Sequence, residues 1–377
     1  MQSRYEERGA AALVLPGGGA RAAYQVGVLK ALSELRGRPE RMFPIICGTS
    51  AGAINAAVLA SHAHEFDFGI ERLVHFWSSM YCERIYRTDA WSVLKSGAHW
   101  LATIVSGGLL PAHPRSLLDN SPLQEFLTRS LRLEGVEAAL DEGALTGLAI
   151  TASAYTQASA VSFYQARDEI EPWQRNRRFG QPARIGVDHL MASAALPLIF
   201  PAAQIGNEYF GDGGMRMVAP LSPAIHLGAD RILVIGTRDE HPDPVPDKPS
   251  TYPSLGEIGG YLLDTIFMDT MNADVARLER INRTLALIPD AERAASGLRP
   301  IEALVIRPSR DLRDVTREHI AAIPRSVRTL LRTLGGWGRD WRMASYLLFE
   351  EAYCSQLIEL GYRDGFDQAD ALTEFMN

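Results

Sequence analysis

The sequence predicts an α/β protein whose central, mostly parallel sheet is covered by helices and followed by a C-terminal helical extension. Two short, strongly apolar runs, residues 11–16 and 43–47, each lead through a turn of small residues into a helical pattern. The order strand, turn, helix, repeated along the chain, is typical of parallel strands with helices on the faces of the sheet. The 377 residues and the 46% hydrophobic content suffice for a large buried core.

The N-terminal third supplies two strand and helix pairs. The run AALVLP at residues 11–16 predicts a buried parallel strand, because it is short, apolar and ended by a proline and three glycines. A helix is expected over residues 21–35, where large apolar residues recur at helical spacing. FPIIC at residues 43–47 predicts the second buried strand, and AGAINAAVLASH at residues 51–62 predicts its helix.

The middle of the chain adds further strands. Residues 148–156 and 160–166 alternate in polarity and are separated by small polar residues, which predicts a hairpin or two adjacent strands. The apolar runs at residues 231–237 and 302–309 predict two more strands, and the second of these is expected to return to the main sheet.

Proline and helical patterns divide the rest of the chain. Five prolines between residues 242 and 253 exclude a helix or a central strand, so residues 239–254 are predicted to form an exposed loop. A long helical pattern follows over residues 255–287, whose large apolar side chains are expected to pack in the core; these are Leu262, Leu263, Phe267, Met268 and Met271. We expect one main domain over residues 8–310 and a helical extension over residues 311–377.

Composition and charge argue against several classes of protein. A formal net charge of −7, from 38 basic and 45 acidic residues, gives no electrostatic case for a nucleic-acid partner. The cysteines Cys47, Cys82 and Cys354 lack C-x-x-C spacing, which argues against a disulfide scaffold and a structural zinc site. The sequence contains neither an apolar secretory signal nor about 18 consecutive apolar residues. A cytoplasmic protein is expected; peripheral membrane contact and a homodimer stay open.

The motif Gly48-Thr49-Ser50-Ala51-Gly52 marks a candidate nucleophile. In G-x-S-x-G the serine lies on a sharp turn between a strand and a helix, and its glycines avoid collisions with the neighbouring elements. Here the motif follows an apolar strand and opens an alanine-rich helix, which is the context that it requires. Ser50 is therefore the candidate nucleophile, with Gly48 and Gly52 supporting the turn.

A serine nucleophile also needs hydrogen-bond donors for the oxyanion. Gly17, Gly18 and Gly19 lie between a predicted strand and a predicted helix, where backbone N–H groups converge near a positive helix end. Arg21 follows directly and is a candidate to support that charge. These glycines are the candidate oxyanion hole.

The same loop allows a competing interpretation. Gly17, Gly19 and Ala22 fit the Gly-x-Gly-x-x-Gly/Ala fingerprint of dinucleotide-binding proteins, which would make the chain an oxidoreductase. That fingerprint also requires an acidic residue at the end of the second strand. The nearest acids, Glu34 and Glu40, fall in the helix and the loop before that strand, so the fit is incomplete.

Asp212 is the candidate base. It follows a short aromatic strand and precedes Gly213 and Gly214, so it lies on a tight glycine turn; an ordinary hairpin turn would have the same pattern. The alternative base is one of the histidines after Asp212, namely His226, His241 and His319. None of these three lies in a glycine turn that would direct it at Ser50.

Together these motifs resemble the patatin-like phospholipases. The matching stretches are the glycine loop Gly17-Gly18-Gly19-Ala20-Arg21-Ala22, the nucleophile motif around Ser50 and the Asp212-Gly213-Gly214 turn. MASAALPLIFP at residues 191–201 resembles the small-residue helix that precedes the aspartate strand in the family. The resemblance covers roughly residues 10–240, with one departure: Ala22 stands where the family usually has glycine.

The resemblance implies a three-layer α/β/α patatin-type fold and hydrolysis of lipid acyl esters. Ser50 would attack the ester carbonyl, Asp212 would accept its proton without a histidine, and the Gly17–Gly19 loop would bind the oxyanion. It implies no metal or cofactor, and a phospholipid or another acyl ester as substrate. A lid or interfacial segment is expected within residues 91–120, of which residues 91–112 contain almost no charge. The Ala22 departure keeps a non-catalytic lipid-binding protein open as an alternative.

Overall fold

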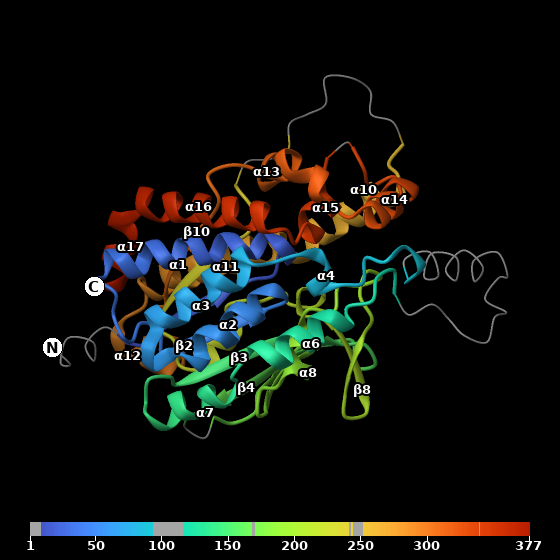
Figure 1. The fold of residues 1–377 in the computed structure, drawn as a ribbon. Coiled ribbons are helices and arrows are strands. Elements are labelled where there is room, and N and C mark those ends of the chain that lie inside the picture. Colours follow the sequence, from blue (N-terminus) through green and yellow to red (C-terminus); the bar gives the residue numbers. More distant parts are fainter. Residues whose placement is uncertain (1–8, 93–115, 168–169, 241–242, 244–251, 339) are drawn as a thin grey trace.

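The computed structural model describes residues 9–92, 116–167, 170–240, 243, 252–338 and 340–377 (Figure 1). Within these residues, ten strands form one sheet with the order β10-β9-β1-β2-β3-β4-β6-β5, and β7 and β8 join it beside β3. The strands are β1 Ala11–Leu15, β2 Ile45–Thr49, β3 Gly147–Ala154, β4 Ser159–Ala166, β5 Gln174–Arg175, β6 Arg178–Pro182, β7 Ala203–Ile205, β8 Glu208–Asp212, β9 Arg231–Ile235 and β10 Glu302–Ile306.

Five neighbouring strands of this sheet, β10, β9, β1, β2 and β3, are parallel. β4 and β8 run antiparallel to β3. The predicted mostly parallel sheet is therefore confirmed, and the two alternating runs in the middle of the chain form the β3–β4 hairpin. The last predicted strand, β10, pairs with β9 at the edge of the sheet.

Helices cover both faces of the sheet and complete three layers. The helices are α1 Ala23–Leu35, α2 Ala51–Ser61, α3 Phe66–Ser78, α4 Cys82–Ile85, α6 Ser121–Ser130, α7 Glu134–Asp141, α8 Val187–Ser193, α9 Ser222–His226, α10 Leu255–Asp264, α11 Thr270–Leu285, α12 Asp290–Ala295, α13 Leu312–His319, α14 Arg325–Thr333, α15 Arg342–Leu347, α16 Glu351–Asp367 and α17 Ala369–Met376. Short 3₁₀ turns are η2 Gly19–Ala22, η3 Ala63–Glu65, η4 Gly213–Met215 and η6 Ile320–Ala322, and η5 Thr265–Asp269 is a π-helical turn.

Alternation along β1 shows how the core is divided between the two faces. Leu13 and Leu15 pack in one apolar cluster with residues of α1, α2, α3 and α16. Ala12 and Val14 pack in a second cluster with residues of α9 and α11. Because successive side chains of a strand point to opposite faces, one short apolar run contributes to both halves of the core.

The C-terminal helix α16 packs closely against α1. α16 lies along α1 (Figure 1), and the Tyr24 hydroxyl donates a 2.9 Å hydrogen bond to Asp364. The backbones approach closely, since a Cβ atom at Gly27 would lie 2.0 Å from the carbonyl oxygen of Ile358. The division of the chain at residue 310 stays a prediction.

The predicted helix over residues 255–287 is interrupted. The π-helical turn η5 separates α10 from α11, and π-turns of this kind occur frequently at functional sites. Leu263, Phe267 and Met271 are buried as expected, whereas the side chain of Leu262 is 51% exposed. The side chain of Met268 lies outside the described residues.

Two predicted surface segments fall largely outside the described part of the chain. Of the expected lid, residues 93–115 are not described, and Trp91 just before them is exposed. Of the expected proline-rich loop, residues 241–242 and 244–251 are not described. Among the helices of the described residues, none combines the length and the apolar character needed to cross a membrane.

Candidate active site

The glycine loop and Ser50 lie side by side at the carboxyl edge of the sheet. β1 and β2 are adjacent and parallel, with Leu15 opposite Gly48, so the segments that follow the two strands leave the sheet together. A Cβ atom at Gly17 would lie only 2.9 Å from the Cβ atom of Ser50. The sheet topology thus brings the candidate oxyanion hole next to the candidate nucleophile.

Strand β3 brings Asp212 to the same place. β2 pairs with the first half of β3 and ends with Thr49 opposite Thr151. β8 pairs with the second half of β3 and ends with Asp212 opposite Ala152. Consecutive residues of β3 therefore hold the residue before Ser50 and the candidate base, although the two are far apart in sequence.

Ser50 has a strained backbone conformation. Its φ of 56° and ψ of −130° place it outside the regions that L-residues normally occupy, and it is the residue that precedes α2. Such a conformation costs about 1–3 kcal/mol and persists only when its surroundings enforce it. One constraint comes from Ser193, whose hydroxyl accepts a 2.8 Å hydrogen bond from the Ser50 N–H and donates a 2.6 Å bond to the Thr151 carbonyl.

The flanking glycines are required by space. A Cβ atom at Gly52 would lie 2.1 Å from the Leu15 carbonyl oxygen, and one at Gly48 would lie 2.5 Å from the Gly52 carbonyl oxygen. A Cβ atom at Gly213 would lie 2.1 Å from the Thr151 carbonyl oxygen. Any side chain at these positions would push the two turns away from the strands that position them.

Asp212 is completely buried, with 0% of its surface exposed. Its Oδ1 accepts a 2.9 Å hydrogen bond from the Gly214 N–H, whereas no described residue makes a hydrogen bond of standard geometry to Oδ2. Burial raises the pKa of Asp212 to about 7, although the Ser50 side chain and the Gly214 N–H lower it. The carboxyl group is thus poised to exchange a proton near neutral pH.

The Gly17–Gly19 loop packs against three segments from later in the chain. Phe267 of η5 contacts Gly17, because a Cβ atom there would lie 2.4 Å from the ring. The Thr237 hydroxyl donates a 2.9 Å hydrogen bond to the Gly17 carbonyl. Gly19 has a φ of +54°, and a Cβ atom there would lie 2.3 Å from the Tyr346 carbonyl oxygen. The loop is therefore shaped by residues from the C-terminal part of the chain.

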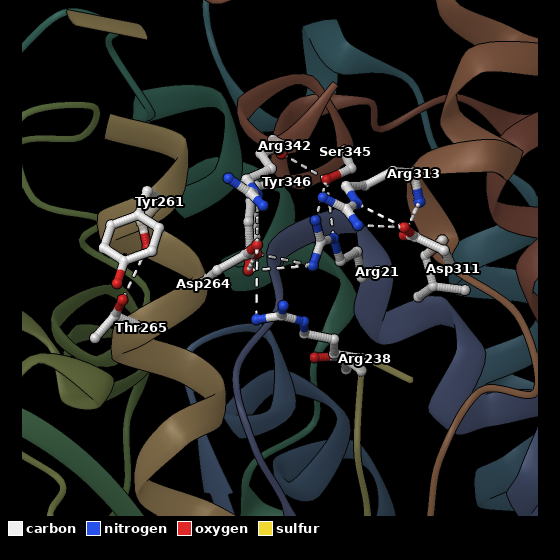
Figure 2. A network of polar contacts seen from close by, with 12 residues as sticks. Arg21, Arg238, Tyr261, Asp264, Thr265, Asp311, Arg313, Arg342, Ser345 and Tyr346 are labelled. Carbon is white, nitrogen blue, oxygen red and sulfur yellow. Dashed lines mark hydrogen bonds and ion pairs between the residues drawn. The ribbon is translucent and has the colours of Figure 1, made fainter. Parts of the chain in front are cut away.

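Arg21 points into a buried polar network (Figure 2), and the described hydrogen bonds of its guanidinium are made there. Its guanidinium donates to the Ser345 hydroxyl at 2.6 Å and 2.9 Å, and to Asp264 at 3.2 Å. The guanidinium also lies 4.1 Å above the centre of the Tyr346 ring. Arg21 thus fastens the turn after the glycine loop to α10 and α15.

Asp264 is shared among three arginines. Besides Arg21, it forms ion pairs with Arg342 at 3.0 Å and with Arg238 at 3.8 Å. Burial raises the pKa of Asp264, but the opposing effects of Arg21, the Tyr346 hydroxyl and the other two arginines outweigh it and hold the pKa below its usual value. The carboxylate compensates charges that are themselves partly or wholly buried.

Replacing Asp264 with Asn should therefore destabilise the fold. The change leaves the buried Arg21 without its carboxylate, and breaking a buried ion pair in this way costs about 3–5 kcal/mol. Urea unfolding would measure the loss. Asp274→Asn is the matched control, because Asp274 is also buried but pairs with Arg277, whose side chain is 47% exposed and stays hydrated. Equal losses in the two variants would contradict the account of this network.

A narrow apolar pocket is lined by Ser50. It contains about 410 Å³ of empty space, its open mouth included, and apart from Ser50 and Gly19 its lining is apolar. The aromatic lining residues are Phe76, Trp77, Phe200 and Phe349. A second cavity is lined by Gly17, Gly48 and Gly214 but not by Ser50. The first pocket is thus the better placed to hold an apolar group attached to an atom that Ser50 attacks.

The histidines considered as alternative bases have other partners. His226 stacks on Trp173 with 4.5 Å between the ring centres. His319 is hydrogen-bonded to Gln356. His241 lies outside the described residues. Among the described hydrogen bonds, none joins a histidine to Ser50 or Asp212.

Ala22 fits its position without strain. It is fully buried in the core cluster, and its φ of −65° is an ordinary helical value. The position therefore does not need the conformational freedom of glycine.

Sequence reasoning missed four residues that shape this site, namely Ser193, Thr237, Phe267 and Tyr346. Ser193 lies in the small-residue segment over residues 191–201, so a polar residue in that motif was the only available signal. The other three contact the glycine loop from distant segments, and no local pattern marks them.

Comparisons with known proteins found similar chains. A cGAMP-activated phospholipase from Pseudomonas aeruginosa (strain BWHPSA011 / Pa011) is 30% identical over 237 residues, 60% of this chain and 61% of that protein. The chain thus spans about six-tenths of that relative. VipD from Legionella pneumophila aligns over 97% of this chain and 67% of its own, with 12% identity and a TM-score of 0.34. The sequence model of the patatin-like phospholipases matches residues 13–225, and the chain belongs to this family.

Proposed function

We propose that this protein is a serine-dependent lipid acyl hydrolase that cleaves the fatty acyl esters of phospholipids or lysophospholipids. Membership of the patatin-like phospholipase family supports acyl-ester hydrolysis and disfavours the dinucleotide-binding interpretation of the glycine loop. The observation that carries the proposal is the meeting, beside Thr151 and Ala152 in the middle of β3, of a strained serine and a buried carboxyl group whose pKa is about 7.

The chemistry follows from this arrangement. Asp212 accepts the hydroxyl proton while Ser50 Oγ attacks the ester carbonyl, and the carbonyl electrons move onto its oxygen. Backbone N–H groups of the Gly17–Gly19 loop and the positive end of α2 stabilise this oxyanion. The alcohol part of the lipid leaves with the proton held by Asp212. Water then attacks the acyl-enzyme in the same way and releases the fatty acid.

Burial allows a carboxylate to act as the base. An ordinary aspartate has a pKa near 4 and binds protons weakly at neutral pH. Burial raises the pKa of Asp212 to about 7, close to the usual value for histidine. A base whose pKa lies near the working pH combines a useful ionised fraction with adequate proton affinity.

The apolar pocket supports a fatty acyl substrate. Its lining includes Ser50 together with the large apolar side chains of Trp77, Phe200 and Phe349. Each methylene group that leaves water for such a pocket contributes about 0.8 kcal/mol. A long-chain ester should therefore have a lower KM than an acetyl ester of the same alcohol.

Activity should depend on pH through Asp212. The carboxylate acts as the base only when ionised, so kcat/KM should rise about tenfold per pH unit at acidic pH and level off above an apparent pKa of about 7. Initial rates with a soluble p-nitrophenyl ester between pH 5 and pH 9 would measure this profile. A midpoint near 4 would show that the base is an ordinary exposed carboxylate instead.

Fatty-acid release from phospholipid, lysophospholipid and short p-nitrophenyl esters tests the proposal. We expect release from at least one long-chain lipid and loss of this release in Ser50→Ala. A folded wild-type protein that binds these lipids but releases no fatty acid from any of them would instead support a non-catalytic lipid-binding role.

A further inference from the structure

Helix α10 directs large apolar side chains to the solvent. Leu255 is 74% exposed, Tyr261 is 60% exposed and Leu262 is 51% exposed. Ile258 is 38% exposed, and Tyr252, just before the helix, is 91% exposed. Spacings of three and four residues place these helix positions on one face. We refer to these five side chains as the α10 face.

The opposite side of α10 explains why this face points outward. A Cβ atom at Gly256 would lie 2.2 Å from the Gly336 nitrogen, and one at Gly260 would lie 2.8 Å from the Arg342 Cβ atom. The small residues of α10 therefore pack against the protein, and its large apolar residues have no room there. An apolar cluster of this kind on a surface usually marks an interaction site.

A basic helix, α14, lies next to α10. The Ser254 hydroxyl donates a 2.9 Å hydrogen bond to the Gly335 carbonyl, which joins the start of α10 to the end of α14. Figure 1 shows the two helices next to each other. α14 carries Arg325, Arg328 and Arg332, and residues 320–338 contain no acidic residue. This segment is locally basic in a chain whose net charge is −7.

The α10 face is also connected to the candidate active site. From Leu255 to Asp264 the helix rises about 14 Å, and it continues directly into η5. In η5, Phe267 packs on Gly17, and Ile266 lies 2.8 Å from where a Cβ atom of Gly214 would be. A surface that held α10 would thus lie about one helix length from the glycine loop, whose Gly17 adjoins Ser50.

We propose that the α10 face, together with the arginines of α14, docks the protein onto an anionic lipid bilayer. Apolar and tyrosine side chains of an interfacial helix enter the boundary between headgroups and acyl chains, and arginines beside them attract anionic headgroups. The docking itself does not depend on the proposed hydrolysis. The benefit of docking for catalysis does rest on the proposed hydrolysis, because docking brings a membrane-borne acyl ester to the pocket beside Ser50.

Vesicle co-sedimentation of the full-length protein tests the docking. The docking variant is Leu255→Ser with Tyr261→Ser. The matched control is Leu287→Ser with Leu298→Ser, because these residues are 85% and 54% exposed and flank α12, at the opposite end of the molecule in Figure 1. We expect wild type and control to bind vesicles of phosphatidylglycerol and phosphatidylethanolamine. The docking variant should bind about tenfold or more weakly.

The role of the α14 arginines in docking has its own test. Arg325→Gln with Arg332→Gln should weaken binding to the anionic vesicles but not to phosphatidylcholine vesicles, and 0.5 M salt should have the same effect on wild type. Equal binding by wild type and the docking variant would overturn the proposal. So would a dimer that the docking variant converts to a monomer in light scattering, because the α10 face would then bind a second copy of the chain.

Two substrates separate this proposal from the proposed hydrolysis. The docking variant should keep full activity on a soluble p-nitrophenyl ester and lose at least about tenfold in phospholipid hydrolysis on vesicles. Equal losses on both substrates would overturn the docking role. A wild-type protein inactive on all esters would refute the hydrolysis, while its vesicle binding would still decide the docking.

Discussion

Ser50→Ala is expected to lower the rate of acyl-ester hydrolysis by about 10⁴-fold or more. Removing a serine nucleophile removes the covalent route, and the activity that remains in such variants comes from the oxyanion hole and substrate binding alone. KM should change little, because the side chain that is lost is small and the apolar pocket stays intact. Fatty-acid release from the preferred lipid measures the effect.

The control for this variant is another buried serine. Ser159 is fully buried on β4, and its hydroxyl has no hydrogen-bond partner among the described residues, so Ser159→Ala should fold and react like wild type. A Ser50→Ala protein that is folded and retains a tenth or more of the wild-type rate would exclude Ser50 as the nucleophile.

Asp212→Asn should have two opposite effects. Activity should fall on the order of 10⁴-fold, because an amide cannot accept the Ser50 proton. Stability at pH 8 should rise, because the variant no longer buries an ionised carboxylate. A trade of stability for function of this kind is common at active sites.

The direction of the stability effect follows from the two pKa values of Asp212. Its pKa is about 7 in the folded protein and 3.8 in the absence of the fold. The folded protein therefore binds the Asp212 proton more tightly than the unfolded chain does. The resulting contribution to the free energy of unfolding is fully present below pH 4 and is lost as the pH rises to about 7. Three pKa units correspond to a difference on the order of 4 kcal/mol. Urea unfolding at pH 5 and pH 8 should show wild type losing more stability than the variant.

A histidine variant completes this test. His226→Ala should remain active, because His226 stacks on Trp173 and makes no described contact with Ser50. If Asp212→Asn stayed active while His226→Ala lost activity, a histidine triad would replace the proposed pair of residues.

Local patterns were enough to predict much of the fold. β1 and β2 are short, apolar and followed by glycine turns, and every one of these features is encoded within about ten residues. Because parallel neighbours end at the same edge of a sheet, the meeting of the glycine loop and Ser50 could also be expected. Asp212 was identified as a candidate by its glycine turn.

Long-range packing was not readable from the sequence. The pairing of β8 with the second half of β3 depends on which strands are neighbours in the sheet. The periodicity of a sequence does not predict which strands are neighbours. Asp264 and Tyr346 reach Arg21 from α10 and α15, so only the folded chain reveals their network (Figure 2). Helical spacing in α10 identified an apolar face but did not indicate that Leu262 points away from the core.

The most direct test of the central claim is the rate at which a fluorophosphonate probe labels the protein, followed by mass spectrometry of the labelled peptide. We predict a single adduct on Ser50, formed at a rate that rises with pH through about 7 and that falls sharply in Asp212→Asn. An adduct on another residue, or a Ser50 labelling rate that Asp212→Asn leaves unchanged, would contradict the account.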